Sequence, residues 1–412
     1  MEKTLPKNAS LKRQILYYLY HYQALSTTSM LVLGKNPKHV YRCLKQLEDD
    51  KYIKQSQLRE AKGHYACSTN YYTLTSKGVQ CFRDLIAKDT DSNSKDPYLI
   101  ITDYERPEFR DTAAKAQYIS SNGISLIANQ LGIVVPHIIP SVKKSDINSL
   151  EESDTEDTLI SSELISYEVY PYTARNSKEK TENKQVYYTP YKTVKETLYS
   201  LNDQRQEYKA GRYAGVIESP NKTALIYMGS KLGFRWNSWQ IKYEKSACHV
   251  FHSHKGHYTN LEAGKTNAIL FMTGPKMFQD IYYDKAGLRS PEVVLGQTFA
   301  SFVVLPQTYD GVRALENYLI SNDSEERAEI ISYATASGYS PNTGPDSALF
   351  PLINAAGERV YIGTVLDLPT VTRARNRQLL GKFPVEVICT AWQESYYSAI
   401  FPNISSFSIL ND

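Results

Sequence analysis

The sequence predicts an α+β fold, in which a small helical N-terminal part precedes a mixed α/β C-terminal domain. The chain has 412 residues, enough for two or three domains with a sizeable core. Up to residue 90, apolar residues recur at spacings of three and four, as in amphipathic helices, and one segment alternates. After residue 165, short β-branched and aromatic runs bounded by Gly, Pro and Asn indicate strands with helices between them.

Two helices are expected before residue 35. Residues 10–25 carry an apolar stripe at helical spacing, and Ser10 is a suitable N-cap. Residues 26–33 begin with hydroxyl side chains, as helices often do, and Gly34 follows where a left-handed turn would close this second helix.

The third helix is expected to begin at Asn36, and one of its faces has the side chains of a nucleic-acid-binding surface. Asn36 is a suitable N-cap and Pro37 stands at the first helical position. One face is apolar, whereas the other carries cationic and amide side chains suited to phosphates and base edges in a major groove. The candidate DNA-binding residues of this region are Lys35, Lys38, His39, Arg42, Lys45 and Gln46.

A hairpin and a closing helix complete this part of the chain. Residues 54–78 alternate, with a break near residues 61–64 that predicts a hairpin tip bearing Arg59, Lys62 and His64. The segment YYTLTSKG resembles the Y-x-L-T-x-K-G signature of winged-helix proteins, with Thr75 placed to cap a helix. This order of elements predicts a winged helix-turn-helix domain over residues 1–90 that binds double-stranded DNA.

The charge distribution favours the same partner. The formal net charge is only +3, but residues 1–90 hold 15 Lys and Arg against 7 Asp and Glu. Basic charge is therefore concentrated in one domain, which favours a polyanion. A winged helix that contacts proteins instead is the alternative for this domain.

Residues 91–164 are expected to form a helical linker with an acidic mobile loop. A helix is predicted over residues 110–122, ending at Gly123 and packing against the winged helix or a dimer mate. Residues 145–163 are rich in Asp, Glu, Ser and Thr, a composition typical of a solvated loop.

Residues 165–412 are expected to form the mixed α/β domain, with a role in partner binding or dimerisation. Its strand order does not follow from the sequence. Strands are predicted within residues 165–172, 185–191, 213–220, 223–229 and 268–274, and helices within residues 193–201, 275–286, 309–321 and 324–334.

Two segments of this second half resemble a known family. QVYYTPYKTVKETL (185–198) resembles a "YxS/TxxEhK" segment, and GRYAGVIESPNKTALIYMG (211–229) resembles an "SRxxGhLhsxxxxxhVYN" hairpin. Both occur in MobC-like proteins of the replication-relaxation group from conjugative and integrative elements of Gram-positive bacteria. The family's "VYN" stands here as IYM (226–228), and the acidic strand motifs of a nuclease-like core are not recognisable.

The resemblance implies a DNA-binding accessory factor of a mobile genetic element, which acts in plasmid mobilisation or conjugation beside a relaxase. A transcriptional repressor of the element is the alternative. Because winged helices often read paired half-sites, a homodimer is also expected.

Half of the eight histidines lie in the segment CHVFHSHKGHY, at His249, His252, His254 and His257. One hypothesis is a divalent-metal site, and a related one is a metal-dependent DNA nickase in which Tyr243 or Tyr258 attacks DNA. Ser253 stands where a bulky apolar residue is typical of such nickases. We therefore expect surface histidines, with no metal, no cofactor and no enzymatic activity.

Other features restrict the function further. The P-loop spacing is absent, so nucleotide hydrolysis is not expected. Arg373, Arg375 and Arg377 suggest either a second phosphate contact or a solvated helix end. Five dispersed cysteines suggest no disulfide framework, and the absence of a signal peptide or membrane-spanning run predicts a cytoplasmic protein without a membrane partner.

Overall fold

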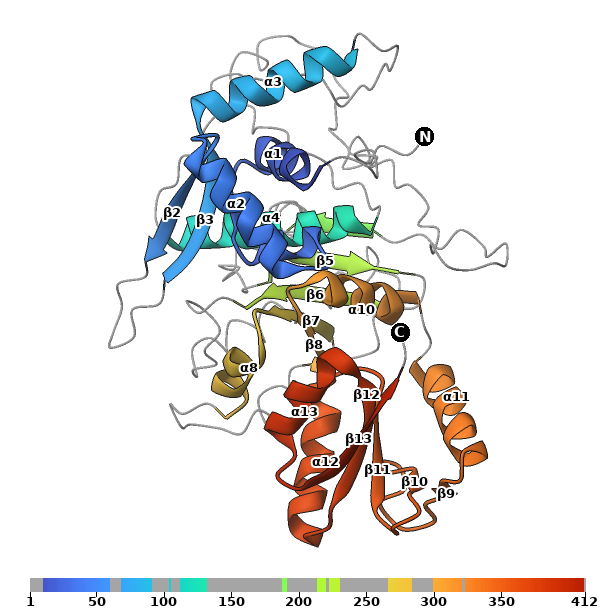
Figure 1. The fold of residues 1–412 in the computed structure, drawn as a ribbon. Helices are drawn as coiled ribbons and strands as arrows, with labels where there is room; N and C mark the ends of the chain where they lie inside the picture. The colour runs from blue at the N-terminus through green and yellow to red at the C-terminus, as the bar shows by residue number, and fades with distance from the viewer. Residues whose placement is uncertain are drawn as a thin grey trace, which may run out of the picture.

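The computed structural model contains a helical N-terminal part and two five-stranded sheets, so the chain is a mixed α/β protein, as predicted (Figure 1). The N-terminal part lies at one end of the molecule and the second sheet at the other. The residues that the structure describes are 10–59, 68–90, 104, 112–131, 187–190, 213–219, 222–229, 266–283, 299–320 and 323–410.

The N-terminal part follows the expected order of helices and hairpin strands. The second predicted helix is a 3-10 helix preceded by a two-residue strand. Strand β3 lies between β1 and β2 in an antiparallel sheet. The elements are α1 (Leu11–Tyr22), β1 (Leu25–Ser26), η1 (Ser29–Leu33), α2 (Pro37–Asp49), β2 (Ile53–Arg59), β3 (Ser68–Leu74) and α3 (Ser76–Thr90).

Three side chains cap these helices as the sequence predicts. The Ser10 hydroxyl accepts a hydrogen bond from the backbone N–H of Arg13 at 3.4 Å. The Asn36 side chain accepts from the N–H of Lys38 at 3.0 Å, and Pro37 occupies the first turn. The Thr75 hydroxyl accepts from the N–H of Gly78 at 3.0 Å. The helix starts are therefore set by local chemistry.

The role predicted for Gly34 is wrong, because its backbone is extended, with φ −149°, and not left-handed. Glycine is favoured there by space: a Cβ would lie 3.1 Å from Cγ2 of Val40. Gly78 serves the same purpose, because a Cβ there would clash with the carbonyl oxygen of Tyr52. Both glycines let neighbouring segments pass close to one another.

Helix α4 (Thr112–Gln130) corrects the prediction that a helix ends at Gly123. The helix runs through this glycine without a break. A Cβ at Gly123 would clash with Oγ of Ser29 in η1 and would lie 2.8 Å from Cε of Met228. Gly123 is therefore a packing glycine, at which α4 passes between the N-terminal part and the first sheet.

Helix α4 is bonded to the N-terminal part by buried polar contacts. The Asn122 side chain donates to the carbonyl oxygens of Tyr22 and Ala24, at 2.7 and 2.9 Å. The Tyr18 hydroxyl donates to Oδ1 of Asn129 at 2.8 Å. One hydrophobic core runs from α1 and α2 through α4 to the first sheet, so the N-terminal part is fixed to the rest of the described structure.

The first sheet has the strand order β4-β5-β6-β7-β8, antiparallel up to β6 and parallel from β6 to β8. Helices α4 and α10 pack against its face toward the N-terminal part, and α8 packs into the core of the other face. The elements are β4 (Tyr187–Pro190), β5 (Gly215–Glu218), β6 (Thr223–Met228), β7 (Thr266–Met272), α8 (Pro275–Tyr282), β8 (Phe299–Pro306) and α10 (Tyr309–Ile320).

The second sheet has the order β13-β12-β11-β10-β9, and β11, β12 and β13 are parallel. Helices α12 and α13 pack on one face and α11 on the other. The elements are α11 (Asp323–Ala336), β9 (Ser340–Pro341), β10 (Leu352–Ile353), β11 (Arg359–Gly363), α12 (Leu368–Gly381), β12 (Val385–Thr390), η5 (Ala391–Gln393), α13 (Glu394–Ile400) and β13 (Ile404–Leu410).

Residues 165–412 therefore contain two sheets, which share a core of aromatic side chains such as Phe302 and Tyr397. Four predicted strands coincide with β4 to β7, and three predicted helices coincide with α8, α10 and α11. The acidic loop over residues 145–163, the strand within residues 165–172 and the helix within residues 193–201 lie outside the described residues.

Candidate nucleic-acid interface

Helix α2 has one buried and one exposed face. Val40, Cys43, Leu44 and Leu47 are buried against α1, η1 and the hairpin. All six predicted DNA-binding residues of this region are exposed: Lys35, Lys38, His39, Arg42, Lys45 and Gln46. The core thus holds the helix in place and leaves its polar face open.

The cations on this face are available to an external anion. Lys38, Arg42 and Lys45 follow one another at spacings of four and three, so they lie on one side of the helix. Within the described part of the chain, none of the three forms an ion pair. Their charge is therefore not neutralised by the surrounding fold.

Charge changes sign along α2. The cations extend from Lys38 in the first turn to Lys45 in the third, whereas Asp49 and Asp50 are exposed where the helix ends. A phosphate backbone would be attracted to the N-terminal turns and repelled by the acidic end. Since the helix N-terminus is also the positive end of its dipole, DNA is expected to approach the first turns.

Tyr41 belongs to the same surface but is not among the DNA-binding residues predicted from the sequence. Its side chain is 47% exposed, unusual for a large aromatic residue. It stands three residues after Lys38 and four before Lys45, so helical spacing places it between the two cations. This spacing is the feature of the sequence from which the position of Tyr41 on the cationic face could have been predicted.

Lys35 lies where the N-terminal part meets α10. Its ammonium nitrogen is 5.5 Å from the centre of the Tyr309 ring, at the first residue of α10. This contact is within the range of a cation–π interaction. The loop before α2 therefore touches the second half of the chain as well as the exposed face.

The hairpin strands pair in register from Ile53 opposite Leu74 to Arg59 opposite Ser68. Strand β2 contributes Lys54, which is exposed. The structure describes the backbone of Arg59 but not its side chain, and Lys62 and His64 lie outside the described residues. The predicted contacts of the hairpin tip therefore stay predictions.

A tyrosine joins the two hairpin strands close to α2. The Gln55 side chain donates to the Tyr72 hydroxyl at 3.1 Å. Burial raises the pKa of Tyr72, and the nearby Glu48 carboxylate and Tyr41 raise it further. The phenol is therefore neutral at physiological pH, and β3 adds no negative charge to the surface.

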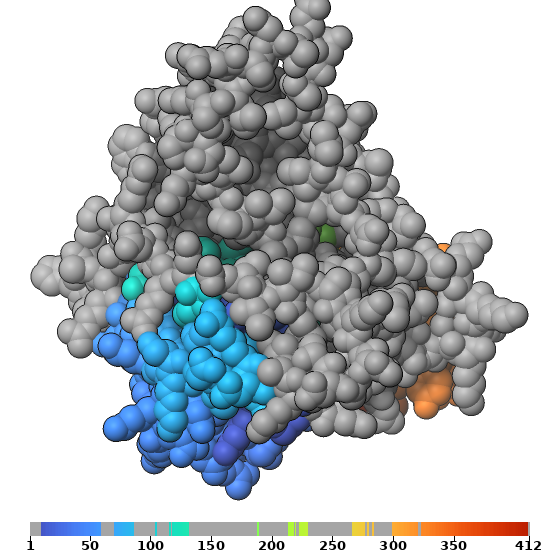
Figure 2. Space-filling model, turned by 90° about the horizontal axis from the view of Figure 1, so that it is seen from above, coloured from blue at the N-terminus to red at the C-terminus, as the bar shows by residue number. Residues whose placement is uncertain are grey.

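The N-terminal part also stands at one edge of the molecular surface. Figure 2 shows its helices and hairpin as a blue region that reaches solvent.

The arginines of the TRARNRQ segment lie within α12 and not at a helix end. Arg375 donates to the carbonyl oxygen of Ile400 at 3.1 Å, and Arg373 donates to the Thr370 hydroxyl at 3.2 Å. Arg377 lies 3.8 Å from the Asp346 carboxylate. These contacts inside the fold leave the second phosphate surface without support.

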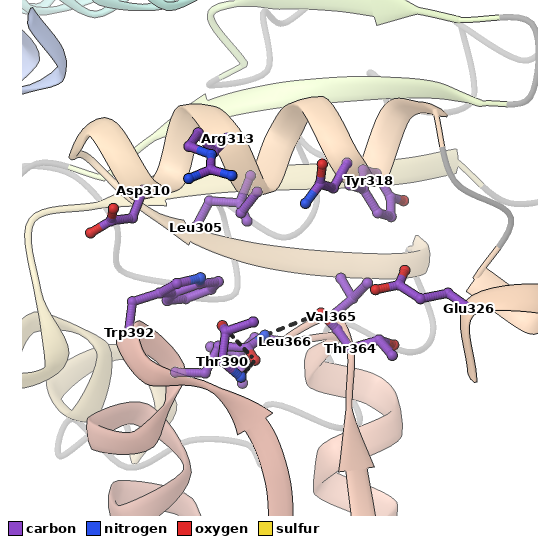
Figure 3. Close-up of a pocket in the computed structure, with 13 residues that line it drawn as sticks. Leu305, Asp310, Arg313, Tyr318, Glu326, Thr364, Val365, Leu366, Thr390 and Trp392 are labelled. Carbon is purple, nitrogen blue, oxygen red and sulfur yellow. Dashed lines mark hydrogen bonds between the residues drawn. The ribbon is translucent and has the colours of Figure 1, made fainter. Parts of the chain in front are cut away.

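A cleft separates α10 from the carboxyl ends of β11 and β12 (Figure 3). Asp310 and Arg313 line it from α10, and Glu326 lines it from α11. The buried Gln393 side chain donates to the carbonyl oxygen of Thr364 at 3.3 Å and so joins the two strand ends. The described residues that line the cleft include no histidine, cysteine or lysine. The cleft lies between the two sheets, and both polar and apolar side chains line it.

The histidine cluster at His249, His252, His254 and His257 lies outside the described residues. Within the described ranges, no group of three or more His, Cys, Asp and Glu is placed to hold a metal. None of the described helices combines the length and the apolar character needed to cross a bilayer.

Comparisons with known proteins give a partial structural similarity. No family model and no curated protein matches the chain. A similar solved structure is that of Bacillus subtilis PadR in complex with operator DNA, with 22% identity and a TM-score of 0.16. The match covers 29% of this chain and 67% of PadR. The interface described above rests on the geometry of α2 itself.

Proposed function

We propose that residues 1–90 form a winged helix-turn-helix domain that binds double-stranded DNA. The observation that carries the proposal is the exposed, unpaired row of Lys38, Arg42 and Lys45 on a helix whose opposite face is buried. Such a helix fits the major groove, and the adjoining hairpin lies where a wing would meet the backbone.

The side chains of α2 divide into two roles. Arg42 and Gln46 have the bidentate donor and acceptor groups that distinguish base edges, so they determine sequence preference. Lys38 and Lys45 are point charges that neutralise phosphates and determine the salt dependence of binding. Arg59, Lys62 and His64 of the hairpin belong to the phosphate-binding group.

The finer biological role rests on the sequence resemblance alone. We propose that the protein is an accessory factor of a mobile genetic element, which binds DNA in mobilisation beside a relaxase. Repression of the element's own promoters is the alternative. Sequencing the fragments that co-purify with the protein distinguishes them, because an accessory factor should enrich transfer origins and a repressor should enrich promoters.

The direct test of DNA binding uses two double variants. Fluorescence anisotropy with a labelled duplex from the enriched fragments measures the affinity of wild type and of Arg42→Ala/Lys45→Ala. Losing one base contact costs about 1 to 3 kcal/mol. Losing one phosphate contact lowers the salt slope by about 0.9. We expect both effects in this variant.

The matched control is Lys276→Ala/Lys382→Gly, which also removes two exposed cations. Lys382 has a left-handed backbone with φ 50°, so glycine there introduces no strain. The control should bind like wild type. Equal affinity of all three proteins, or equal loss in both variants, would refute the interface.

We further propose that the protein binds DNA without cutting it. Incubation with supercoiled DNA and Mn²⁺ should leave the DNA supercoiled. A relaxed product that disappears in His252→Ala/His254→Ala would establish the nickase alternative instead.

A further inference from the structure

Strand β13 forms an open edge of the second sheet. Its seven residues pair with β12 alone. None of the seven is buried, whereas five of the six residues of β12 are. Within the described residues, no backbone group outside the sheet bonds to β13. Among the described residues, the N–H and C=O groups on the outer side of β13 therefore have no backbone partner.

The other three edges of the two sheets are blunted or covered. Edge β9 is two residues long and ends in Pro341, and edge β4 ends in Pro190. Edge β8 is covered, because the N–H of Val304 donates to the carbonyl oxygen of Leu366 at 3.0 Å. Strand β13 shifts register against β12 at Ser405 but pairs regularly from Ser406 to Leu410, and ISSFSIL has neither a charge nor a proline. Natural sheets rarely leave such an edge unused.

The sequence of β13 fits a second copy of itself. In an antiparallel pair centred on Phe407, this residue would stand opposite the partner's Phe407. Ser406 would face the partner's Ser408. Strand β13 shifts register against β12 at Ser405, so the regular part of the pair is centred on residues 406–408. No charges meet there, hydroxyl faces hydroxyl, and apolar side chains face each other at the centre.

Such pairing would also continue one hydrophobic core of the sheet. Phe407 packs against the core under α12 and α13. Residues directly opposite each other in an antiparallel pair share a face, so this core would meet its counterpart. Ile409, which is 45% exposed in one chain, would be covered in part.

We propose that two copies of this chain associate through β13, which joins their five-stranded sheets into one continuous sheet around a two-fold axis. The contact is isologous, so it closes at a dimer. The inference depends on the second sheet alone and stands whether or not α2 binds DNA. If both hold, the same axis relates two α2 helices, the arrangement required for paired half-sites.

Cysteine cross-linking tests the register. Residues opposite each other in an antiparallel pair have Cα atoms about 4.5 to 5.5 Å apart, which suits a disulfide. Phe407→Cys should therefore form a covalent dimer under mild oxidation. Ile409→Cys should not, because its two copies would lie about 13 Å apart along the strands. A mixture of Ser406→Cys and Ser408→Cys should cross-link.

Sedimentation equilibrium tests the association without a cross-link. Wild type should be dimeric at tens of micromolar. Ile409→Lys places a charge on the edge and should weaken the dimer by about tenfold or more. Leu380→Lys is the control, because Leu380 is exposed on α12 and is not part of β13, and this variant should dimerise like wild type. A monomeric wild type, or a dimer that Phe407→Cys does not trap, would overturn the proposal.

Discussion

The cations of α2 and those of α12 look alike in the sequence but have different surroundings in the structure. Arg42 and Lys45 stand on an exposed face, where no described residue forms an ion pair with them. Arg375 and Arg377, in contrast, have acceptors within the fold, at Ile400 and Asp346. A row of cations is therefore available to an external anion only where the fold supplies no acceptors of its own.

The largest expected effect on stability is at Asp346, the carboxylate near Arg377 of α12. This carboxylate is 1% exposed and accepts a hydrogen bond from Nε of Arg359 at 2.6 Å. Asp346→Ala removes the buried anion, so it should lower the free energy of unfolding by about 3 kcal/mol. That is the lower end of the usual range, because Arg359 can be hydrated. Urea denaturation measures the change.

Asp310→Ala is the control for this variant, because Asp310 is exposed on α10. It should change stability by no more than about 0.5 kcal/mol. Equal stability of the two variants would show that the buried Asp346 carboxylate does not stabilise the fold.

The second prediction concerns the replacement by alanine of one arginine in α2 and of one in α12. Arg42→Ala should weaken DNA binding by about 1 to 3 kcal/mol and leave stability nearly unchanged. Arg375→Ala should lower stability by about 1 kcal/mol through its lost hydrogen bond and leave DNA binding unchanged. Anisotropy and urea titrations of both variants give the four values. Weaker DNA binding by Arg375→Ala would remove the distinction between the helices.

A third, smaller effect separates the two kinds of cation on α2. Lys38→Ala should lower the slope of log affinity against log salt by about 0.9 and should weaken all duplexes alike. Arg42→Ala should in addition reduce the preference for the enriched duplex over a scrambled one. If Lys38→Ala changed sequence preference and not the salt slope, the two roles would be reversed.

The smallest effect concerns pH and the second sheet. Burial raises the pKa of Glu386, but hydrogen bonds from Ser408, Tyr339 and Asn354 outweigh it and lower the pKa below its usual value of 4.5. The ionised form thus stabilises the fold above that pH, and this stability is lost as the pH falls through the lowered pKa.

Glu386→Gln should therefore be less stable than wild type at neutral pH, and its stability should fall less steeply below pH 4.5. Thermal denaturation across an acid series measures both. Parallel curves for the two proteins would contradict the assigned shift.

Local features of the fold could be predicted from the sequence because neighbouring residues determine them. The caps at Ser10, Asn36 and Thr75 need only a side chain and an N–H two or three residues away. Strands β6 and β7 could be predicted from their apolar composition and from the glycines that bound them.

Features that depend on distant residues could not be predicted. Gly123 marks a helix end by its type, but its role depends on Ser29 and Met228, which lie far away in the chain. Likewise, the sequence does not show that Arg377 will meet Asp346. In the candidate site, helical spacing correctly predicted that the cations share an exposed face. The same spacing puts Tyr41 on that face, but only the structure shows that its side chain is exposed.

The most direct test of the α2 surface is the acetylation of lysines with and without bound duplex DNA, read by mass spectrometry. DNA at saturating concentration should protect Lys38 and Lys45 and leave Lys276 and Lys382 as reactive as in the free protein. If Lys38 and Lys45 react equally in both states while the protein is bound, the duplex lies elsewhere and the central claim is wrong.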